Sequence, residues 1–244
     1  MGYRSRSQAS ALVRAGRVTC NGRVVRDPET PVRIGRDRLA VDGSRVEQPA
    51  SVYLVMNKPR GLVTSAADEH NRPTVYDLLE KGGPWVSPVG RLDKASEGLL
   101  LLTNDSDWAA KITDPASHLD KRYHVQVDCI AGDELLARIS QGVTVAREYL
   151  RVKEVGILRQ GGKNSWLEVT LDEGKNRHIR RLLAALGVEV LRLVRVAVGP
   201  LELGDLRKGE VRRLTNEEKL RLDHALAGTR SSPKHNRRVP IDVG

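Results

Sequence analysis

The chain has 244 residues, enough for one large domain or for a small domain followed by a larger one. Its 41 basic and 31 acidic side chains leave a formal charge of +10, which favours a polyanionic partner, with nucleic acid ahead of an anionic membrane. No apolar stretch reaches the roughly 18 residues that span a bilayer, the first ten residues lack the apolar core of a signal peptide, and the two cysteines cannot build a disulfide framework. Neither cysteine has metal-ligand spacing, so we expect a cytoplasmic protein without a metal site.

The first 49 residues read as a unit of their own, with ten Arg, no Lys and five acids. Residues 8–15 predict a short helix that Gly16 ends. Asn21-Gly22, between two β-prone segments, predicts a type I′ hairpin. Such a helix and hairpin can present a basic surface to RNA phosphates, although a solvated basic face has the same pattern. Three arginines are the candidates for phosphate contacts: Arg14, Arg17 and Arg23.

Residues 47–51 read as a linker, and the pattern beyond them changes. Strands are predicted over residues 51–59, 98–103, 122–127, 143–158, 165–171 and 189–198. Helices are predicted from Asp105 or Ser106 toward 112, over 133–141 and 176–186, and from a capping box at Thr215 and Glu218. The irregular order of strands and helices indicates an α+β fold with a mixed sheet, and residues 227–244 are expected to form a disordered basic tail.

Asp93 lies with Arg91 directly before a continuous apolar run, residues 98–103, which reads as a strand buried on both faces. A lone aspartate beside a strand is most often a turn or capping residue that pairs with a neighbouring arginine. A carboxylate braced by a rigid strand also suits a preorganised reactive site. The motif alone leaves both interpretations open.

A cluster of cations marks the start of the helix predicted over 176–186. Four apolar residues form its buried stripe: Ile179, Leu182, Leu183 and Leu186. Four cations lie on or before the opposite side: Lys175, Arg177, Arg180 and Arg181. Such a face is commonly just solvated, but it also suits a phosphate or a carboxylate that needs a fixed counter-ion. Tyr123, one of few aromatic residues, can stack on a base or lie at the edge of the core.

Five segments in this order closely resemble the RsuA-like family of ribosomal RNA pseudouridine synthases. They are MNKPRGLVTS (56–65), GRLDKASEGLLLLTNDSD (90–107), KRYHVQV (121–127), EGKNRHIRRLLAALG (173–187) and VLRLVRVAVGPLELGDLRKGEVRRLT (190–215). Ser96 stands where the family usually has Thr, and Val211 where Trp is common. The resemblance implies a catalytic domain over 50–226 with a mixed, largely antiparallel sheet. SRSQASALVRAGRVTCNGRVV (5–25) resembles the alpha-L RNA-binding domain, in a truncated form that lacks the family's first helix.

The resemblance assigns roles to several residues. It implies that Asp93 is the catalytic group, that Arg180 pairs with its carboxylate, and that Tyr123 stacks on a flipped base and serves in proton transfer. The residues implied to bind substrate or shape the cleft are Arg91, Ile179, Asn57, Lys58, Arg177 and Arg181. The base is detached from the sugar, rotated and rejoined through a carbon, so neither a metal nor a redox cofactor is expected.

The expected partner is ribosomal RNA or a pre-ribosomal particle, and we expect a monomer. Large-subunit RNA is favoured, because NRHIRR with RLVRVAVGPL is more similar to the large-subunit members. A non-catalytic RNA-binding or ribosome-assembly protein is the alternative, which would keep the basic surface without needing Asp93. A hydrolase would require a second acid or a nucleophile–base pair, and no such constellation is found.

Overall fold

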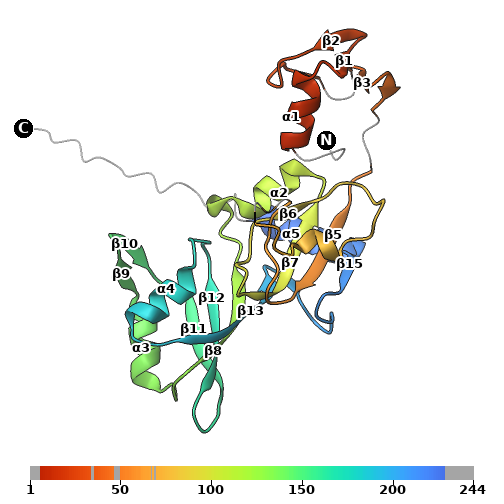
Figure 1. Cartoon of the computed structure of the whole chain (residues 1–244). Coiled ribbons are helices and arrows are strands. Elements are labelled where there is room, and N and C mark those ends of the chain that lie inside the picture. Colours follow the sequence, from red (N-terminus) through yellow and green to blue (C-terminus); the bar gives the residue numbers. More distant parts are fainter. Residues whose placement is uncertain (1–5, 34–35, 47–49, 67, 69, 229–244) are drawn as a thin grey trace, which may run out of the picture.

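The computed structural model describes residues 6–33, 36–46, 50–66, 68 and 70–228 (Figure 1). Two separate sheets carry the fold. One belongs to the first 45 residues and the other, nine-stranded within the described part of the chain, to residues 53–213. Most strand pairs are antiparallel, so the predicted α+β class with a mixed, largely antiparallel sheet is confirmed. Among the described helices, none is long and apolar enough to cross a membrane.

The N-terminal unit packs a helix beside a small sheet of order β2-β1-β3-β4. Its elements are α1 (Arg6–Arg14), β1 (Val18–Cys20), β2 (Arg23–Val25), β3 (Leu39–Val41) and β4 (Ser44–Arg45). Asn21 and Gly22 have φ of 52° and 82°, which confirms the predicted type I′ hairpin. Asp42 and Gly43, with φ of 51° and 80°, make a second hairpin of the same kind that was not predicted.

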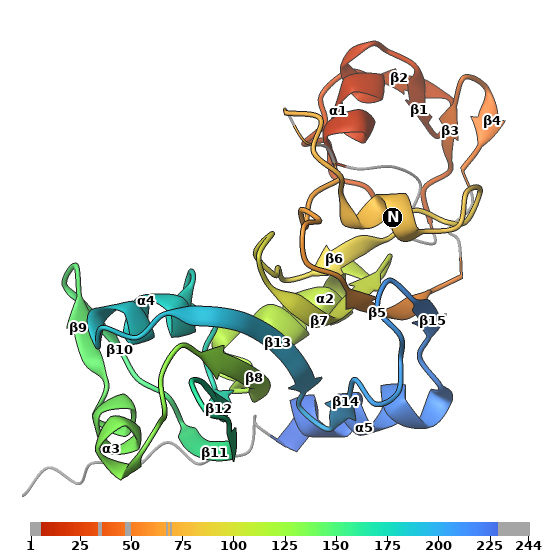
Figure 2. The ribbon, with the colours of Figure 1, turned by 60° about the horizontal axis from the view of Figure 1, so that its bottom comes forward.

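The large sheet has the strand order β11-β12-β8-β13-β7-β5-β15, with β14 paired to β13 and β6 to β7. Its strands are β5 (Tyr53–Lys58), β6 (Ser87–Val89), β7 (Glu97–Thr103), β8 (Lys121–Val127), β11 (Glu154–Gln160), β12 (Ser165–Leu171), β13 (Val190–Val198), β14 (Leu201–Glu202) and β15 (Val211–Arg213). β13 and β7 run parallel, and this pair joins the two halves of the sheet. Figure 2 shows the two halves on either side of this junction.

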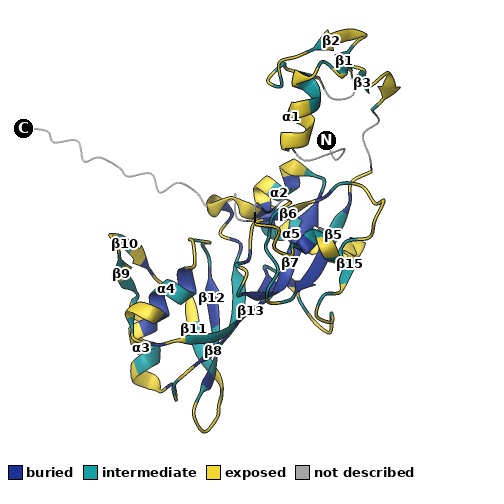
Figure 3. Cartoon of the chain, in the orientation of Figure 1, coloured by how far each residue is buried: buried dark blue, intermediate teal, exposed yellow. Residues whose placement is uncertain are grey.

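β7 is buried along its whole length, as its apolar run predicts (Figure 3). Leu99 and Leu101 pack on one face with residues of α2 (Ser106–Thr113) and α5 (Asn216–Gly228). Leu100 and Leu102 pack on the other face with the segment around η1 (Val75–Leu78), a short 3-10 helix. A strand enclosed on both faces is rigid, so the loop that precedes it starts from a fixed position.

The other half of the sheet carries a second core. α3 (Asp133–Gln141) and α4 (His178–Ala185) cover the apolar face of β8, β12 and β13, and three predicted stripe residues, Ile179, Leu182 and Leu183, are buried there. The segment 143–158 divides into β9 (Val143–Val145), β10 (Glu148–Leu150) and the start of β11, with β9 and β10 paired apart from the large sheet.

Helix ends follow their predicted caps. Asp105 caps α2 by accepting a hydrogen bond from the Trp108 amide at 2.9 Å. Thr215 and Glu218 bond each other's backbone amides at the start of α5, as the capping box predicts. Of the predicted tail, residues 227 and 228 end α5 and the rest lies outside the described residues, as do residues 47–49 of the predicted linker.

Candidate active site

A cleft of about 580 Å³ opens where the two halves of the large sheet meet. Its walls are the loop before β7, the cleft-facing residues of β8 and β13, and the loop that leads into α4. Five of the predicted site residues line it: Arg91, Asp93, Tyr123, Arg177 and Ile179. The fold therefore brings together residues up to 88 positions apart in the sequence, from Arg91 to Ile179.

Asp93 lies in the loop before β7, and its side chain is about one-third exposed to solvent. Lys58 fixes this loop from beneath. Its ammonium is completely buried and donates to the carbonyls of Asp93 at 3.1 Å, Ser96 at 2.8 Å and Pro59 at 3.2 Å. Burial lowers the pKa of Lys58 to about 8, against the opposing influence of Asp93 and Glu97. The buried cation thus holds the backbone at Asp93 and three residues after it.

Gly98, which follows the loop, permits a close approach of two strands. Its φ is +102°, and a Cβ at this position would lie 2.2 Å from the carbonyl oxygen of Arg195 on β13. Glycine alone fits such a position without strain. The close contact of β7 and β13 sets the floor of the cleft beside Asp93, since Arg195 and Asp93 both line it.

Two arginines lie near the Asp93 carboxylate, in an arrangement that differs from the expectation. Nη1 of Arg177 is 3.8 Å from Oδ2 of Asp93, whereas Arg180 makes no ion pair with it within 4.0 Å in the described structure. Arg180 donates instead to the carbonyls of Ala95 and Val190, both at 3.1 Å. Burial, and next the nearby Arg177, lower the pKa of Arg180, while Asp93 acts in the opposite direction. The predicted direct pair of Arg180 with Asp93 is therefore not formed, because the guanidinium bonds the backbone of the Asp93 loop.

Arg177 reaches the carboxylate because α4 begins one residue after it. The backbone of Arg177 is left-handed, with φ of 48°, and this bend turns the chain into the helix at His178. The Arg177 side chain is about half exposed. A solvated cation that lines the cleft suits an anionic substrate.

Tyr123 and Ile179 supply the apolar part of the cleft. Tyr123 lies on β8 between Val169 of β12 and Arg195 of β13, and it packs against both neighbouring cores. Ile179, in the first turn of α4, is 3% exposed. Both line the same cleft as the carboxylate. A flat ring can rest against these side chains with Asp93 beside it.

Several predicted residues lie outside the cleft. Asn57 is buried and donates to the carbonyl of Leu206 at 2.7 Å, which fixes the segment before β15. Arg181 points to the β9–β10 hairpin and binds Glu148 at 2.6 Å. Their predicted substrate contacts are not supported by this placement, because each side chain is engaged within the fold.

The N-terminal arginines belong to the small sheet unit and do not line the cleft. Arg14 and Arg23 are exposed. Arg17 is exposed too, but it pairs with Asp42 and lowers the pKa of that carboxyl. Of the three predicted arginines, Arg14 and Arg23 are therefore exposed and make no ion pair with a described residue.

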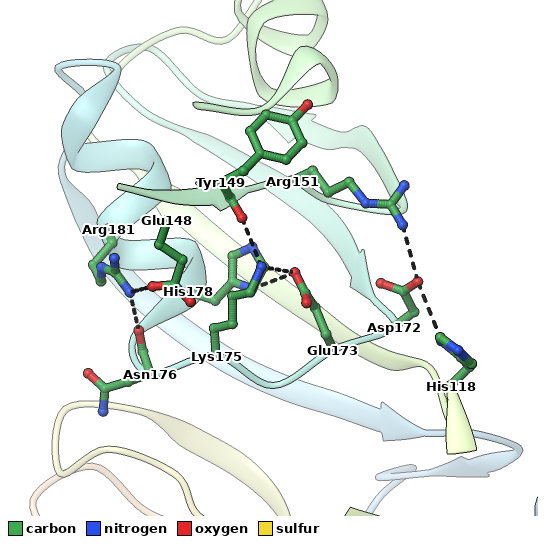
Figure 4. A network of polar contacts seen from close by, with 10 residues as sticks. All are labelled: His118, Glu148, Tyr149, Arg151, Asp172, Glu173, Lys175, Asn176, His178 and Arg181. Carbon is green, nitrogen blue, oxygen red and sulfur yellow. Dashed lines mark hydrogen bonds and ion pairs between the residues drawn. The ribbon is translucent and has the colours of Figure 1, made fainter. Parts of the chain in front are cut away.

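The loop that carries Arg177 is fastened to the β9–β10 hairpin (Figure 4). Nζ of Lys175 donates to the carbonyl of Tyr149 at 2.8 Å and pairs with Glu173 at 2.7 Å. Arg181 joins the same hairpin through Glu148, and Asp172 faces Arg151 and His118. These contacts hold the cleft wall in place.

Sequence reasoning missed several polar residues of the cleft, among them Lys121, His178 and Arg195. The His178 ring is buried, its Nδ1 lies 3.9 Å from a carboxylate oxygen of Glu173, and burial lowers its pKa. Lys121 was detectable, since a residue two positions before Tyr123 on a strand shares its face. Arg195 required the register of β8 against β13, which the sequence does not contain.

Comparisons with known proteins agree on the kind of protein this chain resembles. A family model described as RNA pseudouridylate synthase matches residues 52–185, and an S4 domain model matches residues 1–39. Ribosomal large subunit pseudouridine synthase B of Bacillus subtilis (strain 168) is 36% identical over 91% of each chain. An uncharacterized RNA pseudouridine synthase of Aquifex aeolicus (strain VF5) is 36% identical over 97% of this chain and 95% of its own length. A crystal structure of a pseudouridylate synthase matches with a TM-score of 0.64 and 30% identity, over 89% of this chain and 94% of the other.

Proposed function

Because the chain belongs to the RNA pseudouridylate synthase family, we propose that it isomerises one specific uridine of ribosomal RNA through the carboxylate of Asp93. The observation that carries this proposal is the cleft that joins Asp93 to Tyr123 and Ile179. The similarity to an enzyme named for the large ribosomal subunit favours RNA of that subunit as the substrate. The net charge of +10 suits the binding of RNA, which is a polyanion.

The reaction moves the glycosidic bond from a ring nitrogen to a ring carbon. The base–sugar bond breaks, the base turns, and a carbon of the ring bonds to the sugar; that carbon loses its proton, and the ring nitrogen released from the sugar gains one. Atoms and charge balance within the nucleotide. Asp93 acts as a nucleophile or assists departure of the base. The uridine must leave its stack to enter the cleft, where Tyr123 and Ile179 receive the base.

The loop geometry supports distinct roles for the cations. Lys58 and Arg180 act as positioning residues, because both bond the backbone of the loop that carries Asp93. Arg177 is the counter-ion closest to the carboxylate and reaches the cleft mouth. Arg91, exposed in the same loop, contacts the RNA backbone. Tyr123 stacks on the base and takes part in proton transfer.

We assign RNA binding outside the cleft to the N-terminal module. Residues 1–49 form an S4-type unit, with Arg14, Arg17 and Arg23 on phosphates, and residues 50–226 form the catalytic domain. Arg17 contributes less than the other two, since Asp42 already pairs with it. We further propose that the protein is a cytoplasmic monomer that acts on ribosomal RNA or a pre-ribosomal particle.

The test is a map of pseudouridines in ribosomal RNA from a strain that lacks the gene. One large-subunit pseudouridine should disappear and return when the wild-type chain is supplied. Asp93→Asn keeps the size of the side chain and removes its charge, so the folded variant should bind RNA and fail to restore the modification. Restoration by Asp93→Asn would contradict the catalytic assignment and favour the non-catalytic alternative. Loss of a small-subunit pseudouridine would contradict the preference for the large subunit.

A further inference from the structure

Lys121 and Arg195 place two cations deep in the cleft, on the same face of the sheet as Tyr123. Lys121 precedes Tyr123 by two positions on β8, and Arg195 lies directly opposite Tyr123 on β13. All three side chains line the cleft. Two residues along a strand span about 7 Å, so the ammonium lies beside the place assigned to the base, not on top of it.

No described carboxylate pairs with either cation within 4.0 Å. Arg195 is 7% exposed and donates through Nε to the carbonyl of Leu99 at 2.7 Å, while its other N–H groups have no described acceptor. The side chain of Lys121 makes no described hydrogen bond or ion pair. A guanidinium and an ammonium are therefore held partly out of water in the same cleft.

The acids closest to Lys121 already have other partners. The Asp120 carboxylate pairs through Oδ2 with Lys153 at 2.6 Å, while its Oδ1 is buried without a described partner. Asp172 faces Arg151 at 3.6 Å and His118 at 3.9 Å (Figure 4). Burial, and next the neighbouring Arg195, lower the pKa of Lys121, while Asp120 and Asp172 raise it less. The cleft as a whole is lined by five cations and by two acids, Asp93 and Glu173.

An unpaired cation beside another cation in a partly dry site opposes folding. Such groups are common where a ligand supplies the missing charge. A salt-bridging role within the fold does not account for them, since the neighbouring acids are engaged elsewhere. The missing partner is an anion that enters the cleft together with a flat ring.

We propose that Lys121 and Arg195 bind the phosphate of the nucleotide whose base rests against Tyr123. The assignment of the base rests on the proposed function, whereas the anion site rests on the two cations. A nucleotide holds its base and its phosphate on opposite sides of the ribose, so a base against Tyr123 leaves a phosphate within reach of the cations farther along β8. Arg195, held by Leu99, provides a fixed fork of donors, and Lys121 provides a movable point charge. The pair would recognise the target as a nucleotide of a chain and not as a free nucleoside.

The experiment compares uridine, uridine 5′-monophosphate and uridine 3′-monophosphate by titration calorimetry on the full chain. At least one monophosphate should bind about tenfold or more tightly than uridine, as one or two charge-assisted hydrogen bonds provide. Lys121→Met should remove that preference and still bind uridine. Lys121→Arg should retain most of the preference, because it keeps the charge.

Lys111→Met is the matched control, since Lys111 is an exposed lysine on α2 outside the cleft, and it should retain the full preference. Lys121→Met should also melt at or above the wild-type temperature, because it removes an unpaired, half-buried cation. Equal binding of uridine and both monophosphates by the wild type would overturn the proposal. So would an unchanged preference in Lys121→Met.

The calorimetric result does not depend on the ribosomal target. If the preference for a monophosphate is found while no ribosomal pseudouridine is lost in the deletion strain, the anion site stands and the proposed substrate fails. If a ribosomal pseudouridine is lost while uridine and the monophosphates bind alike, the proposed function stands and the anion site fails.

Discussion

Replacement of Lys58 by Met tests whether a buried cation positions the catalytic loop. Methionine fits the volume of the lysine stem and removes all three donors. The carbonyls of Pro59, Asp93 and Ser96 then lose their bonds to the ammonium. Two of these carbonyls belong to the loop that carries the reactive carboxylate, so the effect should concentrate there.

Two opposing terms set the size of the effect. Hydrogen bonds to a charged donor contribute about 1.5–3 kcal/mol each, so three of them contribute about 4.5–9 kcal/mol. The fall of the Lys58 pKa from 10.5 to about 8 corresponds to a burial cost of about 3 kcal/mol, which methionine removes. The hydrogen bonds exceed this cost by about 1.5–6 kcal/mol, so Lys58→Met should lower the free energy of unfolding by that amount and the melting temperature by roughly 3–24 °C.

The rate should fall further than stability explains. A loop that moves by about 1 Å costs on the order of a hundredfold in rate. The assay is single-turnover tritium release from RNA labelled at the uracil carbon that forms the new bond, measured well below the melting temperature. Lys111→Met, an exposed replacement, should match the wild type. Wild-type turnover by folded Lys58→Met would refute the positioning role.

The pKa of Lys58 also predicts opposite responses of activity and stability to pH. Because the folded-state pKa lies below the unfolded value of 10.5, the cost of burying the Lys58 charge is fully present below about pH 8 and is relieved as the pH rises from 8 toward 10.5. Above pH 8 the neutral amine has two donors for three carbonyls, so the loop loosens and the rate should fall. The contribution of Lys58 to the free energy of unfolding, measured against Lys58→Met by denaturant melts, should rise over the same range. A parallel fall of both quantities would contradict the assignment.

Three further predictions follow from the fold. Arg180→Ala should lower the rate about a hundredfold and also lower the melting temperature, because two backbone carbonyls lose their hydrogen bonds. Arg177→Ala should lower the rate alone. An unchanged melting temperature in Arg180→Ala would contradict the backbone role. Gly98→Ala should destabilise the chain by about 2–5 kcal/mol in denaturant melts, because the added Cβ meets the backbone of β13. Gly156→Ala, with open space around it, should have little effect. Equal free energies of unfolding for the two variants would refute the close approach. Deletion of residues 1–49 should weaken RNA binding and flatten its salt dependence with the rest of the chain still folded, and an unchanged salt slope would exclude phosphate contacts from this module.

Local chemistry predicts much of the framework. The apolar run over 98–103 predicts a strand buried on both faces, and the structure confirms it because α2 and α5 cover one face while the η1 segment covers the other. The Asn21-Gly22 turn is predicted because both residues accept positive φ. The same signal at Asp42-Gly43 was available and was missed.

Other turns carry no such signal. The β9–β10 hairpin turns at Ala146 and Arg147, with φ of 50° and 68°, although neither residue type favours that conformation. Residues 143–158 therefore read as strand without a visible break. The left-handed backbone of Arg177 is equally unexpected, and it moves the start of α4 to His178. Tertiary contacts, such as those of Lys175 with Tyr149 and Arg181 with Glu148, stabilise these bends after the chain has folded.

The site, too, has parts that local sequence predicts and parts that depend on tertiary contacts. Asp93 and Tyr123 were predicted because each lies in a motif that resembles a known family, and the fold brings both to one cleft. The partner of the carboxylate was not identified, because helix periodicity places Arg177 and Arg180 on one side of the helix predicted over 176–186 without saying which guanidinium reaches the loop. The register of β7 against β13, fixed at Gly98, decides it: the Asp93 loop approaches α4 closely enough for Arg180 to bond its backbone and leaves Arg177 beside the carboxylate. A sequence motif therefore identifies the reactive group, whereas the contacts that aim it depend on strand register, which no local pattern in this chain encodes.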